Sequence, residues 1–373
     1  MRGARQWRQR RTLAGIFTPY FMKKILIACL LAGLGLANAG AAEPSAQQHA
    51  VKDTALAGVR MIPIHTPKGE FKVWTRRVGD NPAIKVLLLH GGPGTTHEYL
   101  ETFDRYFPGA SIEYYYYDQL GSAFSDQPDD PSLYTVQRFT DEVEQVRKAL
   151  GLGKDNFYLF GHSWGGLLAI EYALAHPGKL KGLVISNMMA SAPAHNEYVE
   201  RVLAPQIDPA ALAEVRALEA EGKTDDPRYM ALLLPQFYER HFIRMPFANW
   251  PEPLLRASEH LNPKVYKPLQ GPSELGIHGR LAQWDRFEDL ARIDVPTLVI
   301  GARHDTMDPA YLRKMSQRLQ QGQFLYCENG SHMAMYDDAA CYFDGLLTFL
   351  RAAPASTPTP TPKPIKPRSL RSY

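Results

Sequence analysis

The sequence contains few cysteines and none of the short motifs that commonly bind metal ions. Only three cysteines occur among 373 residues, at Cys29, Cys327 and Cys341. No C-x-x-C pair and no H-E-x-x-H sequence is present, which argues against a structural or catalytic zinc site. We therefore expect a protein that works without a metal ion or other cofactor.

A hydrophobic run long enough to cross a bilayer is also missing. The longest apolar stretch, residues 25–36, follows the basic segment 22–24 and ends at the small residues 37–39. A basic start, a short apolar run and small residues are typical of a signal peptide, whereas a membrane-spanning helix needs about 20 apolar residues. We predict a signal peptide over residues 1–39, with Met22 as a candidate start, and export to the periplasm or the medium. The alternative is an N-terminal membrane anchor.

Cysteine pairing depends on this export. Cys29 falls in the predicted signal peptide, so Cys327 and Cys341 remain in the mature chain. An oxidising compartment would favour a disulfide between them, and the alternative is a pair of buried thiols. The sequence leaves both alternatives open.

Both ends of the chain lack acidic residues, and this hides the charge of its body. The formal net charge is +3, yet seven Lys and Arg residues lie in residues 1–39 and four in residues 354–373, with no Asp or Glu in either segment. Residues 40–353 therefore carry a net charge of −8. An acidic body argues against a nucleic-acid partner, and it suits a substrate that carries a positive charge.

Strands and helices are predicted to alternate along the first half of the chain. Residues 43–68 are interpreted as a polar linker, and an alternating pattern predicts an edge strand after it. Apolar runs predict further strands, and a helical pattern precedes residue 151. The predicted strands cover residues 71–78, 84–90, 112–117, 157–160 and 183–186. This order predicts the α/β class, with a mostly parallel, doubly wound sheet covered by helices on both faces.

The alternation stops near residue 190. Residues 190–285 contain helical patterns, plainest over 211–220 and 230–242, and no clear strand, which predicts an inserted helical cap. Strand and helix patterns resume over residues 286–353. The α/β core is thus predicted to comprise residues 40–189 and 286–353. Residues 354–373 alternate proline with polar residues and are predicted to be a disordered tail.

A nucleophile elbow is predicted around Ser163. The pattern Gly161-His162-Ser163-Trp164-Gly165 follows an apolar strand and opens a helix. G-x-S-x-G between a strand and a helix places the serine hydroxyl on a sharp turn above the sheet. Ser163 is therefore the candidate nucleophile.

An acid and a base follow Ser163 in the order that α/β-hydrolases use. Asp305 comes after the strand predicted over residues 297–301, and His332 comes after the strand at 324–326. A serine needs a base to take its proton, and the base needs an acid to fix its tautomer. We predict that Asp305 and His332 complete a catalytic triad. The alternatives are a solvated loop aspartate and a structural histidine.

Two backbone amides are predicted to form the oxyanion hole. The amide of Trp164 follows the nucleophile, and Gly92 lies in the glycine-rich loop from His90 to Gly94. Gly92 has no side chain, so its backbone can approach a substrate closely. A phosphate-binding loop is the alternative, but the loop lacks the required Lys-Ser/Thr pair and Pro93 removes a donor.

Four motifs together resemble the proline iminopeptidase family, serine aminopeptidases of the α/β-hydrolase fold. These motifs are His90-Gly-Gly-Pro-Gly94, Asp118-Gln-Leu-Gly-Ser122, Gly161-His-Ser-Trp-Gly-Gly166 and Gly330-Ser-His332. The resemblance runs from about residue 57 to residue 351 and includes the cap. It implies removal of an N-terminal residue, often proline, from short peptides, amides or arylamides.

The resemblance also implies a role for a cap glutamate. In related tricorn-interacting aminopeptidases, the glutamate that matches Glu274, in Gly271-Pro-Ser-Glu274, binds the free ammonium of the substrate. A second acid follows the catalytic aspartate there, and this chain has Thr306 at that position. We therefore expect Glu274 to bind the amine without that second acid.

These observations favour an exported serine aminopeptidase that acts on a short peptide or amino-acid amide through an acyl-enzyme. An amidase or esterase of amino-acid derivatives would use the same triad without needing a free amine. A non-catalytic binding protein is the alternative from another class, and it would have no need of Ser163, Asp305 and His332 together. The sequence does not indicate an oligomeric state.

Overall fold

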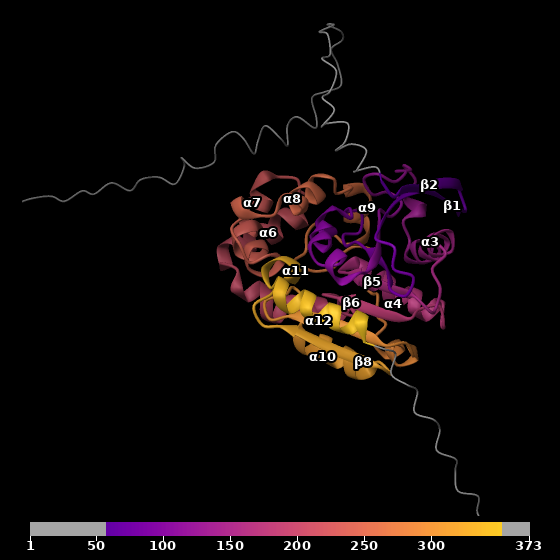
Figure 1. The fold of residues 1–373 in the computed structure, drawn as a ribbon. Coiled ribbons are helices and arrows are strands. Elements are labelled where there is room, and N and C mark those ends of the chain that lie inside the picture. The colour runs from indigo at the N-terminus through magenta and orange to yellow at the C-terminus, as the bar shows by residue number, and fades with distance from the viewer. Residues whose placement is uncertain (1–56, 353–373) are drawn as a thin grey trace, which may run out of the picture. The chain divides into compact units, whose positions relative to one another are not determined.

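The computed structural model describes residues 57–352 (Figure 1). The predicted signal peptide, its candidate start and the predicted tail fall on residues 1–56 and 353–373 and lie outside the described residues. Within the described range, no helix is long and apolar enough to span a membrane.

The core is one eight-stranded sheet with the order β1-β2-β4-β3-β5-β6-β7-β8. β1 pairs antiparallel with β2, and β2 pairs antiparallel with β4, while all other neighbours are parallel. The strands are β1 (Val59–Thr66), β2 (Gly69–Val78), β3 (Lys85–Leu89), β4 (Glu113–Tyr117), β5 (Phe157–His162), β6 (Gly182–Ser186), β7 (Thr297–Ala302) and β8 (Gly322–Cys327). The predicted α/β class with a mostly parallel sheet is confirmed.

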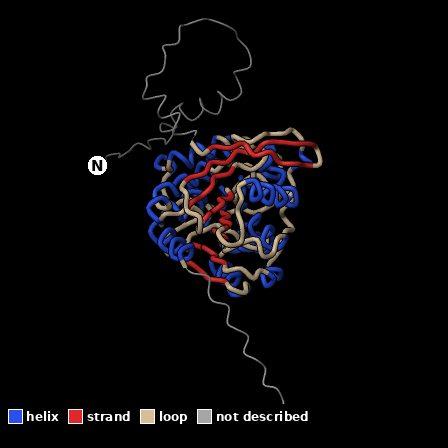
Figure 2. Tube along the Cα trace, turned by 45° about the vertical axis from the view of Figure 1, so that its right-hand side comes forward, coloured by secondary structure: helices blue, strands red, loops and turns tan. Residues whose placement is uncertain are grey.

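The first strand corrects the sequence interpretation. Residues 59–66, interpreted as part of a polar linker, form β1, and β2 is therefore the second strand of the sheet (Figure 2). Ile62 and Ile64 are fully buried, whereas Met61 is exposed, which is the alternation of a half-buried strand. Pro63 lies in the middle of this strand, and a strand at the edge of a sheet tolerates proline.

Helices cover both faces of the sheet because the parallel strands are buried on both sides. Helices α3 (Val136–Ala149), α4 (Trp164–Ala175) and α10 (Pro309–Arg318) pack with side chains such as Leu87, Leu159 and Val299 in one apolar core. The 3₁₀ helix η1 (Glu98–Arg105) and α12 (Ala339–Arg351) pack with alternate residues of the same strands, such as Leu88, Phe160 and Ile300, in the other. Alternate side chains point to opposite faces of a strand, so one run of residues serves both cores.

A helical cap lies between β6 and β7, and helices α6, α7 and α8 gather on one side of the molecule in Figure 1. Its larger elements are α5 (Ala192–Tyr198), α6 (Pro209–Ala220), α7 (Pro227–Leu233), the π-helix η6 (Leu234–Phe242), α8 (Glu252–Glu259) and α9 (Pro263–Leu269). An isolated bridge between Ser191 and Asp285 joins the two ends of the insertion. Ser191 Oγ also donates a 2.8 Å hydrogen bond to the Asp285 carboxylate.

Candidate active site

Ser163 lies on a sharp turn between β5 and α4. Its φ of 54° and ψ of −127° fall in a region that a residue with a side chain rarely adopts. Glycine is required on both sides of this turn. A Cβ on Gly161 would lie 2.0 Å from the Gly165 oxygen, and a Cβ on Gly165 would lie 2.2 Å from the Leu89 oxygen. The close approach of strand and helix therefore sets the turn that carries Ser163.

Asp305 follows β7 and is fully buried. Four groups contact its carboxylate. Asn187 Nδ2 donates to Oδ2 at 2.6 Å, and Oδ1 accepts the Met307 amide at 3.1 Å and the Thr306 hydroxyl at 3.4 Å, while His332 Nδ1 lies 2.9 Å from Oδ1. A carboxylate held by several donors cannot rotate, so the direction in which Asp305 accepts a hydrogen bond from His332 is fixed. Asn187, directly after β6, is a site residue that the sequence interpretation did not single out.

His332 follows β8, and its ring is 1% exposed. Its Nδ1 contacts Asp305 Oδ1 at 2.9 Å and Thr306 Oγ1 at 3.0 Å. Because a carboxylate only accepts hydrogen bonds, Nδ1 carries the ring proton and Nε2 keeps its lone pair. Burial opposes the charged ring, but the hydrogen bond and charge of Asp305, with the charge of Glu274, outweigh it and raise the pKa of His332.

A chain of hydrogen bonds links the glycine loop, the elbow and the His332 loop. His162 Nε2 lies 2.9 Å from the His332 carbonyl oxygen and must donate to it, so His162 Nδ1 accepts from the Tyr99 hydroxyl at 3.0 Å. The Tyr99 oxygen in turn accepts the Gly91 amide at 2.7 Å. Burial lowers the pKa of His162 to about 3, so this ring stays neutral. Tyr99 and His162 therefore fix the positions of the three loops relative to one another.

The glycine loop packs directly on Ser163, the candidate nucleophile. A Cβ on Gly91 would lie 3.1 Å from Ser163 Cβ. The Gly91 amide is already bonded to Tyr99, which leaves Gly92 as the next amide of the loop. Gly92 has a φ of 107°, and a Cβ there would lie 2.8 Å from the Gly94 amide nitrogen. The predicted oxyanion donors, Gly92 and Trp164, thus come from the two segments that meet at Ser163.

Glu274 lies in the cap loop between α9 and β7, and it is partly exposed. Its Oε1 accepts the Tyr266 hydroxyl at 2.5 Å, and its amide donates to the Tyr238 hydroxyl at 3.1 Å. Burial raises the pKa of the Glu274 carboxyl, which the charge of His332 and the Tyr266 hydrogen bond oppose. No Lys, Arg or His among residues 57–352 forms a salt bridge with it. The Glu274 carboxylate therefore has no ion-pair partner within the described residues, in the cap or in the core.

The position of the Glu274 loop is fixed by contacts that only the folded chain creates. Asn196 of α5 donates from Nδ2 to the Ile277 oxygen at 2.9 Å and accepts the Ile277 amide at 2.7 Å. The Tyr229 hydroxyl contacts Ser273 Oγ at 2.9 Å. These contacts attach the loop to two cap helices that are distant from it in sequence.

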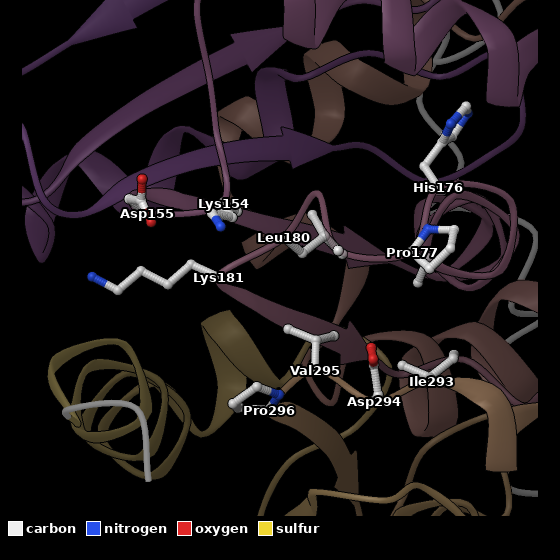
Figure 3. A pocket seen from close by; sticks show the side chains of 12 residues that line it. Lys154, Asp155, His176, Pro177, Leu180, Lys181, Ile293, Asp294, Val295 and Pro296 are labelled. Carbon is white, nitrogen blue, oxygen red and sulfur yellow. The ribbon is translucent and has the colours of Figure 1, made fainter. Parts of the chain in front are cut away.

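A separate cavity of about 450 Å³ lies away from these residues (Figure 3). Its lining includes Lys154 before β5, Lys181 before β6, and Val295 and Pro296 before β7. These positions are the amino ends of the strands, whereas Ser163 and Asp305 lie at the carboxyl ends. Parallel α/β sheets bind ligands at the carboxyl ends, so this cavity is not the candidate active site.

A disulfide joins Cys327, at the end of β8, to Cys341 in α12. Of the two alternatives that the sequence left open, the structure contains the bonded one. The two cysteines are 14 residues apart and bracket His332. The bond therefore closes the loop that carries the candidate base.

Replacing Cys341 with alanine is expected to lower the free energy of unfolding by about 3 kcal/mol, because the bond closes a loop of this length in the unfolded chain. Denaturant unfolding of the oxidised protein and the variant measures this difference. Under reducing conditions, the natural protein and the Cys341→Ala variant should have similar free energies of unfolding. Equal stability of both proteins under oxidising conditions would contradict a formed disulfide.

Comparisons with known proteins agree on the fold and on one family. The α/β-hydrolase fold family model matches residues 85–339. The chain is 56% identical over 290 residues to a proline iminopeptidase of Flavobacterium johnsoniae, covering 78% of this chain and 97% of that protein. It is 54% identical over 293 residues to a proline iminopeptidase of Elizabethkingia meningoseptica, again covering 78% and 97%.

Solved structures are similar along the same part of the chain. The crystal structure of VinJ superposes with a TM-score of 0.72 at 30% identity, covering 78% of this chain and 98% of that one. The proline iminopeptidase of Mycobacterium smegmatis superposes with a TM-score of 0.69 at 26% identity, covering 78% and 97%.

Proposed function

This chain belongs to the proline iminopeptidase family of the α/β-hydrolase fold, and we propose that it is a serine aminopeptidase that releases N-terminal proline from peptides and amides. The observation that carries the proposal is the buried contact of 2.9 Å between His332 Nδ1 and Asp305 Oδ1, beside the elbow that presents Ser163. A nucleophile, an acid and a base in this chain order form the triad that performs acyl transfer in α/β-hydrolases.

In the proposed reaction, Ser163 Oγ attacks the carbonyl carbon of the first residue while His332 Nε2 takes the hydroxyl proton. The Trp164 and Gly92 amides hold the oxyanion, and such donors are each worth roughly 3 kcal/mol. His332 then gives its proton to the leaving amine as the C–N bond breaks. Water attacks the acyl-enzyme, with His332 again as base, and this step releases the free amino acid.

Asp305 orients the base in this mechanism. It fixes the Nδ1–H tautomer of His332 and stabilises the ring when it becomes charged. Asn187 and the Met307 amide hold the carboxylate itself. Thr306 Oγ1 adds a contact of 3.0 Å to His332 Nδ1, so the residue that replaces the second acid of related enzymes supports the base.

Glu274 is proposed to bind the free ammonium of the substrate. Its carboxylate is held by Tyr266 and by no described cation, so a substrate ammonium would supply the missing partner. Glu274 is half-buried, and a bound substrate would cover its carboxylate further. A carboxylate covered in this way favours a ligand that pairs with it and disfavours one that leaves it unpaired. An acetylated amine would leave it unpaired, which supports an exopeptidase rather than a general amidase.

The activity is expected to be lost on the acid side of neutrality. His332 must be neutral to act as base, and its pKa is raised above the ordinary 6.5, so kcat/KM should fall as the pH drops through a value higher than 6.5. Glu274 must be ionised to bind an ammonium, and its raised pKa adds to the same acid-side loss. A pH profile of kcat/KM on a prolyl arylamide measures both. A midpoint below 6.5 would contradict the raised pKa of His332.

Chromatographic identification of the released amino acid tests the proposed function. Purified protein is incubated with prolyl, alanyl and leucyl arylamides and with short peptides that begin with proline. Release of free proline, with the remaining peptide intact, is the expected result. Cleavage only at internal bonds, or hydrolysis of simple esters without any release of proline, would contradict it.

We also propose that the chain works outside the cytoplasm. The Cys327–Cys341 disulfide supports this, because such bonds persist in oxidising compartments. Cell fractionation with N-terminal sequencing of the mature protein tests it, and an unprocessed protein in the cytoplasmic fraction would contradict it.

A further inference from the structure

A short segment of the cap, residues 241–244, runs beside the loop that carries His332. The His332 amide donates to the His241 oxygen at 3.0 Å, and the Met333 amide donates to the Phe242 oxygen at 2.8 Å. Ser331 Oγ also donates to the Phe242 oxygen at 3.0 Å. The backbone oxygens of His241 and Phe242 thus tie this segment to the loop that carries the base.

The other end of the segment is attached to the same loop. The Arg244 amide donates to Asp337 Oδ2 at 2.9 Å, and Arg244 Nη1 donates to the Asn329 oxygen at 3.1 Å. Asp337 Oδ1 accepts the Ser331 amide at 3.1 Å, so one carboxylate links the segment and the loop. The loop from Asn329 to Met333 therefore depends on the cap for its position.

The segment also contacts the loop of the catalytic acid. His241 Nδ1 lies 3.1 Å from the carbonyl oxygen of His304, the residue before Asp305, and must donate to it. The His304 amide donates to the Gly330 oxygen at 3.0 Å, which joins the acid and base loops directly. The segment therefore holds both partners of the His332–Asp305 pair.

The Phe242 ring packs on the base itself. Its centroid lies 5.7 Å from that of the His332 ring, with an angle of 30° between the planes. On its other sides Phe242 meets Tyr238 at 5.5 Å and Trp250 at 5.8 Å. The Tyr238 hydroxyl accepts the Glu274 amide. Aromatic contacts thus connect the base to the candidate amine site through Phe242 and Tyr238.

We propose that Phe242 is a positioning residue for His332: its ring covers one face of the imidazole and fixes the plane in which Nε2 meets Ser163. The inference rests on the roles proposed above for Ser163 and His332. The cap then does more than select substrates, because the triad is aligned only when residues 241–244 are packed against the loops that carry His332 and Asp305. A misplacement of about 1 Å at such a site can cost roughly 100-fold in rate.

Phe242→Leu removes the ring and keeps an apolar side chain, and Phe242→Met does the same with a longer chain. Phe242→Tyr keeps the ring. Phe287→Leu is a matched control, because Phe287 is also partly buried and packs on the ring of Tyr311, with centroids 5.1 Å apart, in a part of the core that does not include the triad. Circular dichroism and thermal unfolding of all variants establish that they are folded.

The readout is the rate at which a fluorophosphonate labels Ser163, measured as a function of pH. This reaction needs the nucleophile and the base but no amine recognition. We expect Phe242→Leu and Phe242→Met to label about 10-fold more slowly, within the loss that misalignment produces. The acid limb should move to higher pH, because water reaching the ring removes the burial that opposes its charge. Phe242→Tyr and Phe287→Leu should stay within about twofold of the natural protein, since both leave the stack on His332 in place.

Two results would overturn the inference. One is a Phe242→Leu protein that labels at the natural rate with an unmoved acid limb. The other is an equal loss in Phe242→Leu and Phe287→Leu, which would mean general loosening of the packing. Failure of the proposed function is a separate outcome. A protein that is labelled at Ser163 but releases no proline would contradict the aminopeptidase activity, and the labelling rates of the Phe242 variants would still test the positioning role.

Discussion

Replacing Ser163 with alanine is expected to lower kcat/KM on a prolyl arylamide by about 10⁵-fold, because the acyl-enzyme can no longer form. The loss should appear in kcat, while substrate binding persists, since the Gly92 and Trp164 amides and Glu274 remain. Initial rates at saturating and limiting substrate measure the two parameters. The elbow strain at a φ of 54° is unchanged by this replacement, so the variant should unfold within a few degrees of the natural protein.

Residual activity gives a sharp outcome for this variant. The orienting groups alone should leave a rate above that of the uncatalysed reaction, because binding and oxyanion donors act without the nucleophile. A Ser163→Ala protein with full activity would contradict the mechanism. Loss of fluorophosphonate labelling in the variant, with retention of its folded signal, would assign the labelled group to Ser163.

Replacing Glu274 with glutamine is expected to lower kcat/KM on a free prolyl arylamide by about 10²- to 10³-fold. The bound substrate would cover the half-buried carboxylate, and loss of one partner of an ion pair buried in this way costs about 3–5 kcal/mol. Glutamine keeps the size of the side chain and an oxygen for the Tyr266 hydroxyl. The N-acetylated arylamide, which has no ammonium, should be turned over by both proteins at similar low rates. Glu197→Gln, an exposed acid paired with Arg201 on the same cap, is the matched control.

The same replacement is expected to raise stability above neutral pH. The folded-state pKa of Glu274 is raised, so ionisation of this carboxyl disfavours folding. The loss of stability grows as the pH rises from the unfolded-state pKa to the folded-state pKa, stays constant above that, and is absent below the unfolded-state pKa. Glutamine has no charge to bury. Thermal unfolding at two pH values checks the sign, and a Glu274→Gln protein that is less stable only at high pH would contradict it.

Much of the candidate site could be predicted because its residues occupy the ends of strands. Each of Ser163, Asp305 and His332 follows an apolar run, and parallel strands bring their carboxyl ends to one edge. The structure then places Asp305 and His332 in hydrogen-bond contact and Ser163 on the strained turn between β5 and α4. Local patterns of this kind depend little on the rest of the fold.

Residues that act through tertiary contacts could not be predicted in the same way. Tyr99 and His162 align three loops, and Asn187 holds Asp305, but their partners are 63, 170 and 118 residues away in sequence. A single sequence gives no signal for such pairs. Phe242 resembles any apolar residue of an amphipathic helix until its ring is found against His332.

The cap illustrates the same limit. The patterns over residues 211–220 and 230–242 predicted helices, and α6, α7 and η6 occupy these ranges with earlier starts. Asp208 and Asp226 cap two of these starts by accepting backbone amides, which sets boundaries that periodicity alone misses. The placement of Glu274 depends instead on Asn196 and Tyr229, and it became visible only in the fold.

We propose that the free amino end of the peptide binds at Glu274 before Ser163 attacks. The most direct measurement compares kcat/KM of the purified protein on prolyl arylamide and on N-acetylprolyl arylamide at the same pH. We expect a preference of at least about 100-fold for the free amine, because acetylation leaves the Glu274 carboxylate unpaired. Equal rates on the two substrates would contradict it.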